Sequence, residues 1–117
     1  MIKNLDERTF SQTHCIVAAG SYVTFTPMNK VFVARLRHFS ELLEPEGWIR
    51  CHRSYLINPK FIDFDKTAPH EITLLSGRKY PVARRSIGTI NKIIKELKFL
   101  KNPKDEININ SNYPISV

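Results

Sequence analysis

The amino-terminal part of the chain shows a period-two pattern of β-prone side chains. Three such runs cover residues 14–19, 22–26 and 30–34. The turns between them, Gly20-Ser21 and Pro27-Met28-Asn29, are short enough for hairpins, because glycine tolerates a positive φ and proline fixes a turn. The pattern predicts a meander of three antiparallel strands.

Helical spacing follows the meander. Leu36, Phe39, Leu42 and Leu43 fall on one helical face. Pro45-Glu46-Gly47 ends this segment, since proline cannot continue a helix and glycine suits its exit. The spacing predicts a short helix that packs on the sheet as a lid.

Strand patterns return after Gly47 and give about seven or eight short strands in all. Asn58-Pro59 marks a turn between two of them, and Ser76-Gly77 marks a tight hairpin. Pro81 donates no hydrogen bond, so its strand is expected at an edge or at a bulge. The further strands are expected at residues 48–51, 55–57, 61–64, 71–75 and 78–83.

A second amphipathic helix ends the patterned part of the chain. Ser86 is placed to cap it, and Lys92, Lys95 and Glu96 lie opposite an apolar stripe that faces the core. The fold class predicted from the pattern is mainly β, with one interposed and one carboxy-terminal helix. The stripe consists of Ile87, Ile90, Ile94 and Leu97, widened by Ile93 and Leu100.

Length and composition fit a single cytoplasmic domain. The 117 residues suffice for one core, and we expect a short lead-in at residues 1–12, the domain at 13–101 and a polar flexible tail at 102–117. No apolar run approaches the roughly 18 residues of a membrane helix, and the segment from Met1 to Glu7 is not a secretory signal. We therefore expect no membrane partner. Two cysteines cannot build a disulfide framework, which favours reduced thiols.

The positive charge is concentrated in one segment. Eighteen Lys and Arg oppose eleven Asp and Glu, for a net charge of +7. Residues 78–101 contain eight basic residues and one acid, so they carry the whole excess, 8 − 1 = +7. A basic region of this kind favours a polyanionic partner, nucleic acid first and an anionic membrane second. For Lys92, Lys95 and Lys98, a solvated helix face is an equally good explanation.

Catalytic or cofactor-binding patterns do not stand out. The four glycines are scattered, which excludes a glycine-rich phosphate loop, and no nucleophile elbow or carboxylate pair is present. His14-Cys15 and Cys51-His52 contain the residue types of a zinc site, but neighbouring residues on a strand point to opposite faces. We therefore expect no enzyme, no metal and no cofactor, and we expect both cysteines in the core.

The dipeptide His52-Arg53 interrupts two apolar strand stretches. A bulge or short loop with two outward donors explains this break. The guanidinium of Arg53 has a rigid fork of donors that fits guanine O6 and N7, and it also fits phosphate. The alternative is that Arg53 pairs with Asp63 across two strands.

Three segments of the chain match a known family pattern in the same order. Residues 48–58, WIRCHRSYLIN, match F-x-R-x-H-R-S-Y-L-V-N, and residues 19–23, AGSYV, match D-G-N-Y-V. Residues 76–85, SGRKYPVARR, match S/N-G-x-x-L-P-V-S-R-R. With these segments the chain resembles the LytTR (LytR/AlgR-type) DNA-binding domains of bacterial response regulators, over residues 13–98.

The resemblance implies an elongated stack of small antiparallel sheets whose loops enter successive major grooves and bend the DNA. Carried over by position, Arg53 and Arg84 match residues that reach base edges, and Ser21 and Tyr22 match a third base-contacting region. The implied function is a sequence-specific, double-stranded DNA-binding transcriptional regulator of a two-component system. Flanking residues are expected at DNA phosphates: Arg50, His52, Ser54, Lys79 and Arg85.

Some features depart from the family pattern. Ala83 replaces a serine, which removes one hydroxyl for a phosphate. The 117 residues do not include the receiver domain typical of such regulators, so a stand-alone regulator and a fragment are both open. A separate receiver or sensor protein is an implied partner, and a dimer on repeated half-sites is another. Two other functions stay open: a single-strand binding module that stacks bases on Tyr22, Tyr55 and Tyr80, and a protein-interaction domain that has lost DNA binding.

Overall fold

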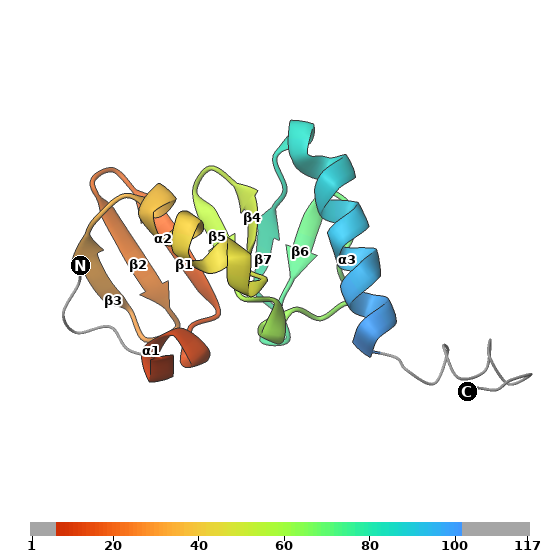
Figure 1. The fold of residues 1–117 in the computed structure, drawn as a ribbon, viewed down its shortest axis with the longest axis horizontal. Helices are drawn as coiled ribbons and strands as arrows, with labels where there is room; N and C mark the ends of the chain where they lie inside the picture. The colour runs from red at the N-terminus through yellow and green to blue at the C-terminus, as the bar shows by residue number, and fades with distance from the viewer. Residues whose placement is uncertain (1–6, 102–117) are drawn as a thin grey trace, which may run out of the picture.

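The computed structural model describes residues 7–101, which form two antiparallel sheets and three α-helices arranged side by side (Figure 1). The strands are β1 (Cys15–Ala19), β2 (Tyr22–Thr26), β3 (Lys30–Val33), β4 (Ile49–His52), β5 (Tyr55–Ile57), β6 (Glu71–Thr73) and β7 (Lys79–Pro81). The helices are α1 (Glu7–Gln12), α2 (Leu36–Leu43) and α3 (Ile87–Lys101), with short 3₁₀ helices η1 (Glu44–Glu46), η2 (Pro59–Phe61) and η3 (Arg84–Ser86). The larger sheet has the order β3-β2-β1-β5-β4, and the smaller one pairs β6 with β7. The predicted mainly β fold, with an interposed and a carboxy-terminal helix, is confirmed.

The three-stranded meander forms as predicted. β1 and β2 pair from Cys15 opposite Thr26 to Ala19 opposite Tyr22, which leaves a two-residue turn. Gly20 in this turn has φ +60°, a conformation that glycine adopts without a Cβ penalty. Asn29 has φ +62° in the turn before β3, and asparagine is among the residues that tolerate this region.

The short helix α2 also forms where the spacing predicts it. Leu36, Phe39 and Leu43 are buried, whereas Leu42 is half exposed at 49%. Pro45 does not end the helical segment. It lies in the first turn of η1, where a backbone N–H is not needed for a hydrogen bond. Gly47 ends the helical segment with φ +100°, and its N–H donates to the Glu44 carbonyl at 2.9 Å.

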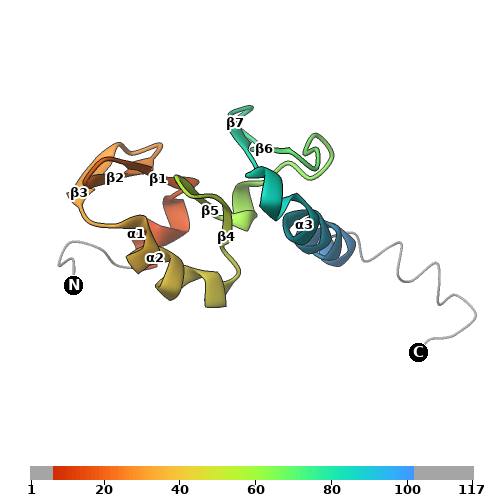
Figure 2. The same cartoon turned by 90° about the horizontal axis from the view of Figure 1, so that it is seen from above.

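Two hydrophobic clusters lie on opposite faces of the larger sheet. Ile16 and Leu56 face the cluster under α2, and their neighbours Cys15 and Ile57 face the cluster shared with β7 and α3. This alternation is the one that pleated strands require. Figure 2 shows α1 and α2 on one side of β1–β3, away from β6 and β7. Each face of the central strands is therefore covered by a different set of elements.

The strand expected at residues 61–64 is wrong. η2 occupies Pro59–Phe61 instead, and the Asn58 side chain caps it by accepting the Lys60 N–H at 3.1 Å. Ile62 then makes only an isolated bridge with Leu74. Proline at the first helical position and asparagine at the cap outweigh the β propensity of the residues that follow.

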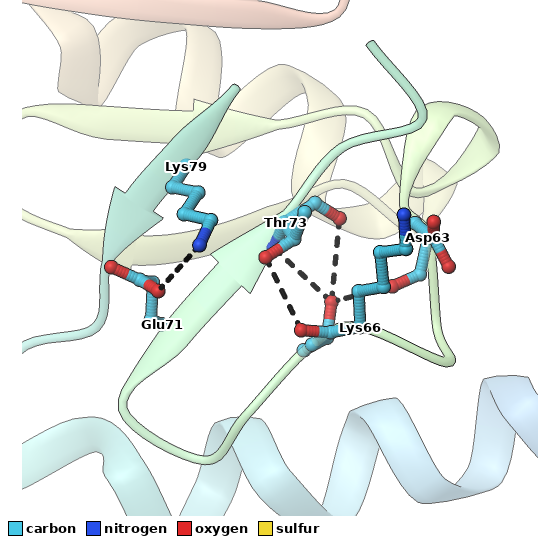
Figure 3. Close-up of polar contacts among 6 residues, drawn as sticks. Asp63, Lys66, Glu71, Thr73 and Lys79 are labelled. Atoms are coloured by element: carbon cyan, nitrogen blue, oxygen red, sulfur yellow. Dashed lines mark hydrogen bonds and ion pairs between the residues drawn. The ribbon is translucent and has the colours of Figure 1, made fainter. Parts of the chain in front are cut away.

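The loop after Ile62 is held by hydrogen bonds rather than by a ladder (Figure 3). The Thr67 hydroxyl donates to the Asp63 carbonyl at 2.9 Å and accepts the Thr73 N–H at 3.2 Å. The Thr73 hydroxyl in turn donates to the Lys66 carbonyl at 3.2 Å. These contacts tie residues 63–67 to β6 and supply its backbone with partners.

Both ends of the described chain are helical. Residues 7–12, expected in a lead-in, form α1, in which Thr9 is buried and Phe10 lies 5.9 Å from Phe25 between ring centroids. α3 begins at Ile87, directly after η3. Ile90 and Ile94 of its apolar stripe are buried, Ile87, Ile93 and Leu97 pack against the same cluster while partly buried, and Leu100 is 68% exposed. The expected tail at 102–117 lies outside the described residues. None of the helices described is long and apolar enough to cross a membrane.

Candidate nucleic-acid interface

Three short segments lie along one edge of the molecule, uppermost in Figure 1. The Gly20-Ser21 turn joins β1 to β2, the Arg53-Ser54 turn joins β4 to β5, and Arg84-Arg85 follows β7. The strand order places β1 beside β5, so the first two turns are neighbours. We refer to these three segments together as the turn edge.

Backbone hydrogen bonds connect the segments of the turn edge. The Ala18 N–H donates to the Ser54 carbonyl at 2.9 Å, which ties β1 to the second turn. The Ala83 N–H donates to the Cys51 carbonyl at 2.8 Å, which ties the residue before Arg84 to β4. The two sheets therefore meet next to the arginines, and the spacing of the second and third segments is fixed by the backbone.

The turn between β4 and β5 is supported from within. The pairing register shifts between Arg50 and His52, which is the break that the sequence predicts there. The Arg50 guanidinium donates from Nε to the His52 carbonyl at 3.1 Å and from Nη2 to the Arg53 carbonyl at 2.7 Å. His52 Nδ1 accepts the Ser54 N–H at 3.1 Å. Arg50 and His52 thus hold the backbone that presents Arg53.

Arg53 itself is exposed and free of acidic partners among the described residues. The alternative pairing with Asp63 is wrong, because no ion pair joins the two side chains within residues 7–101. The guanidinium of Arg53 is therefore available to a ligand.

Arg84 and Arg85 are both exposed and form the first turn of η3. The Ser86 N–H donates to the Ala83 carbonyl at 2.8 Å, which closes this turn. α3 continues directly from it and is anchored by buried Ile90 and Ile94. A short turn between a strand and a packed helix gives both arginines a rigid base.

The first turn presents Ser21 and Tyr22, and both are exposed. A hollow of about 460 Å³ lies beside Ser21 and is also lined by Arg35. The Ala34 N–H donates to the Ser21 carbonyl at 3.2 Å and brings Arg35 to this place. Arg35 lies outside the three motif segments, so no sequence pattern marks it as part of the interface. The pairing of β2 with β3 is what places it.

Lys79 is not brought to the turn edge. It lies at the opposite end of β7 from Arg84, and its Nζ is 4.0 Å from a Glu71 carboxylate oxygen (Figure 3). Both side chains are largely exposed, so this pair contributes little to stability. Lys92 and Lys95 are exposed on α3, the helix that leads away from the turn edge.

The two cysteines are core residues, as predicted. Both are fully buried, and the Cys51 thiol donates to the Pro81 carbonyl at 3.5 Å. Burial raises the pKa of both thiols to about 12, and the neighbouring Cys51 adds to the rise at Cys15. Within residues 7–101, no group of His, Cys, Asp or Glu could hold a metal ion.

Comparison with known proteins identifies the family and the fold of the chain. The family model described as the LytTr DNA-binding domain matches residues 10–95. A solved structure, the LytTr DNA-binding domain of a methyl-accepting/DNA response regulator from Bacillus cereus, has the same fold, with a TM-score of 0.60. It is 24% identical and covers 73% of this chain and 83% of that one. No curated protein sequence matches the chain. The family model spans both sheets and most of α3, and the chain belongs to the LytTR family of DNA-binding domains.

Proposed function

We propose that this domain is a sequence-specific, double-stranded DNA-binding transcriptional regulator that binds through the turn edge. One observation carries the proposal: Arg53 and Arg84 are exposed on neighbouring segments whose backbones are joined by the hydrogen bond from Ala83 to Cys51. Guanidinium groups on a rigid support can read guanine in the major groove. Family membership supports DNA as the ligand.

Each part of the turn edge has a proposed role. Arg53 and Arg84 contact base edges, and Ser21 with Tyr22 forms the third base-contacting region. Arg85, His52 and Ser54 lie beside them and contact phosphates. Arg50 is placed to act mainly as a support for the Arg53 turn, since two of its donors are used there. Lys79 lies at the other end of β7 and close to Glu71, so it has no role in the turn edge.

The spacing of the three segments indicates how they meet a duplex. Adjacent strands are about 4.8 Å apart, so the three spacings from β2 to β4 in the larger sheet cover about 14 Å. β7 belongs to the smaller sheet, and the hydrogen bond from the Ala83 N–H to the Cys51 carbonyl holds the Arg84 segment next to β4. Successive major grooves of straight B-DNA repeat at about 34 Å. The outer segments therefore reach successive major grooves only when long side chains and a bent duplex cover the difference.

Charge supplies affinity in this scheme. The excess of seven positive charges lies in residues 78–101. Arg84 and Arg85 belong to the turn edge, Arg78 and Lys79 lie at the other end of β7, and the lysines follow along α3. Lysine and arginine contacts release counterions from the phosphates, so binding is expected to weaken steeply with salt. Base contacts then select the sequence, each by roughly 1–3 kcal/mol.

The context of the domain is part of the proposal. LytTR family membership favours a bacterial, cytoplasmic regulator in which a receiver or sensor protein provides the signal. The sequence has no glycine-rich phosphate loop and no nucleophile elbow, which favours a binding role over an enzymatic one. Dimers on repeated half-sites would let two copies read one operator.

A single-strand binding module is less well supported by the aromatic side chains. Such a module needs several exposed rings for base stacking. Tyr80 is only 5% exposed, and its ring packs against Tyr55 with 5.0 Å between ring centroids. Tyr22 is 52% exposed, so it is the tyrosine of the three that could stack on a base. The buried tyrosines serve the core.

Competition between oligonucleotides tests the proposal. A fluorescent duplex recovered by selection from random DNA is bound, and the unlabelled duplex or either of its single strands is then added. We expect the duplex to compete at least tenfold better than either strand. Equal or better competition by a single strand would favour the single-strand module, and no retention of any DNA would overturn the proposal and favour a protein-interaction domain.

A further inference from the structure

A second polar site lies at the end of the molecule opposite the turn edge. A pocket of about 210 Å³ opens where the β2–β3 turn meets the β6–β7 turn, at the lower ends of β2 and β7 in Figure 1. We refer to it as the Tyr80 pocket. The two sheets form its walls, and junctions between substructures are common places for small ligands. Its polar lining residues are His14, Thr26, Asn29, Ser76, Arg78 and Tyr80.

The Tyr80 hydroxyl is the unusual feature of this pocket. The side chain is 95% buried, since only 5% is exposed, and its hydroxyl oxygen has no hydrogen-bond partner. Burial raises the pKa of Tyr80, and Cys15 adds to the rise. Thr26 and Arg78 lie near the hydroxyl and lower the pKa, but neither makes a hydrogen bond with it. A buried hydroxyl without a partner is costly. A ligand reaches so enclosed an oxygen only when a neighbouring side chain moves, and Arg78 is an exposed lining side chain that can do so. A ligand atom admitted in this way would remove the cost.

The polar groups of the lining are mostly donors. Arg78 carries a positive charge, and no aspartate or glutamate lines the pocket. The Ser76 hydroxyl accepts the Arg78 N–H at 3.3 Å, which leaves its own proton to donate. The Thr26 hydroxyl already donates to the Cys15 carbonyl at 3.1 Å, so it offers only an acceptor.

His14 adds a further donor under the rim. Its ring stacks on Phe61 with 3.9 Å between centroids, which fixes its orientation. Burial lowers the pKa of His14, so the ring is mainly neutral at pH 7 and has one N–H. Lys60 Nζ lies 5.7 Å from the other ring of this stack and adds positive charge nearby.

We propose that the Tyr80 pocket binds a compact oxyanion, a phosphate or a carboxylate group of a small molecule. Arg78 supplies the charge, Tyr80 the buried donor, and Ser76 and His14 further donors around it. The volume admits a group of a few heavy atoms, since drug-sized sites start at about 300 Å³. The DNA backbone is not the source, because strands β2 and β7 separate this pocket from the turn edge.

NMR titration of the ¹⁵N-labelled chain at pH 7 tests the proposal. Sodium phosphate and sodium acetate are added separately, with sodium chloride keeping the ionic strength constant. We expect saturable amide shifts confined to Asn29 and residues 76–80 with at least one of the two anions, and the one that binds more tightly identifies the ligand class. Shifts that grow linearly with both anions, or that spread over the basic surface, would show an adventitious ion only and overturn the proposal.

Two variants and one control sharpen the test. Arg78→Ala is expected to weaken saturable binding by at least about tenfold, and Tyr80→Phe by about tenfold through loss of one charge-assisted hydrogen bond. Tyr80→Phe keeps the ring and removes the unpartnered hydroxyl, so its unfolding midpoint should stay equal or rise. Arg37→Ala removes the same charge on α2, outside the pocket, and should bind as the parent does. Parent-like binding by Tyr80→Phe would refute the role of the hydroxyl and with it the proposed site.

Discussion

The support of the Arg53 turn by Arg50 leads to a prediction that separates geometry from charge. Arg50→Lys keeps the positive charge at the base of the turn. It loses the planar fork that reaches the His52 and Arg53 carbonyls at 3.1 and 2.7 Å. If Arg50 mainly orders the turn, this conservative change impairs sequence recognition. If Arg50 mainly attracts a phosphate, lysine replaces it well.

The structure sets the size of the effect. Hydrogen bonds from a charged group contribute about 1.5–3 kcal/mol each when buried. Arg50 is partly exposed, so we expect about 1–2 kcal/mol for both together. In Arg50→Lys the turn is less ordered before binding, so this free energy is lost from binding when the DNA orders the turn. Affinity for the selected duplex should therefore fall roughly 5–30-fold.

Fluorescence anisotropy against the selected duplex and a scrambled one, at several salt concentrations, measures the effect. We expect Arg50→Lys to lose affinity for the selected site and to keep both its scrambled-DNA affinity and its salt slope. Arg50→Ala would also lower the slope by about 0.9 if a phosphate contact were lost. Selected-site binding by Arg50→Lys within twofold of the parent would refute the supporting role.

Further predictions concern Arg35, the glycine after η1 and the thiols. Arg35→Ala should weaken binding to selected and scrambled DNA alike and reduce the salt slope by about 0.9, because Arg35 lies beside Ser21 at the end of the turn edge. An unchanged salt slope in the same titration would place Arg35 outside the interface. Gly47→Ala should lower the unfolding free energy by about 1 kcal/mol and the melting temperature by roughly 4–8 °C, since φ is +100° there, and calorimetry showing no change would contradict this. Cys15 and Cys51 should react with a thiol reagent at pH 8 only as fast as the chain unfolds, because burial raises each pKa to about 12; rapid labelling of the native chain would contradict their burial. The same shifts stabilise the fold fully below the ordinary thiol pKa of 9.0, and this contribution is lost as pH rises from 9.0 towards about 12.

Much of the fold follows from local sequence. The meander and α2 have strong periodicities and the turn residues that their geometry needs, so pattern and structure agree. The strand expected at residues 61–64 is wrong because Asn58 and Pro59 start a 3₁₀ helix whose hydrogen bonds compete with β pairing. α1 has six residues, which is too short to show a period, and tertiary packing of Phe10 supports it. Leu100 matches the stripe of α3, but within residues 7–101 no element covers that end of the helix.

The site depends more on tertiary structure. Exposure of Arg53 and the break beside it could be predicted from the pattern of the central motif. The joining of its turn to Arg84 could not, because the bond from Ala83 to Cys51 links residues 32 positions apart. Arg35 and the Tyr80 pocket also result from strand pairing, and no local pattern marks them. Lys79 shares a charged segment with Arg84 but lies at the other end of β7.

The most direct measurement of the central claim is site selection from random duplex DNA by the parent, Arg53→Ala and Arg84→Ala. We predict that the parent enriches one sequence, and that each variant folds with an unchanged melting temperature. Each variant should lose roughly 1–3 kcal/mol of its preference for that sequence over a scrambled one. The positions at which the preference is lost should differ between the two variants. Variants that enrich the parent's sequence with the parent's preference would show that these arginines do not read DNA.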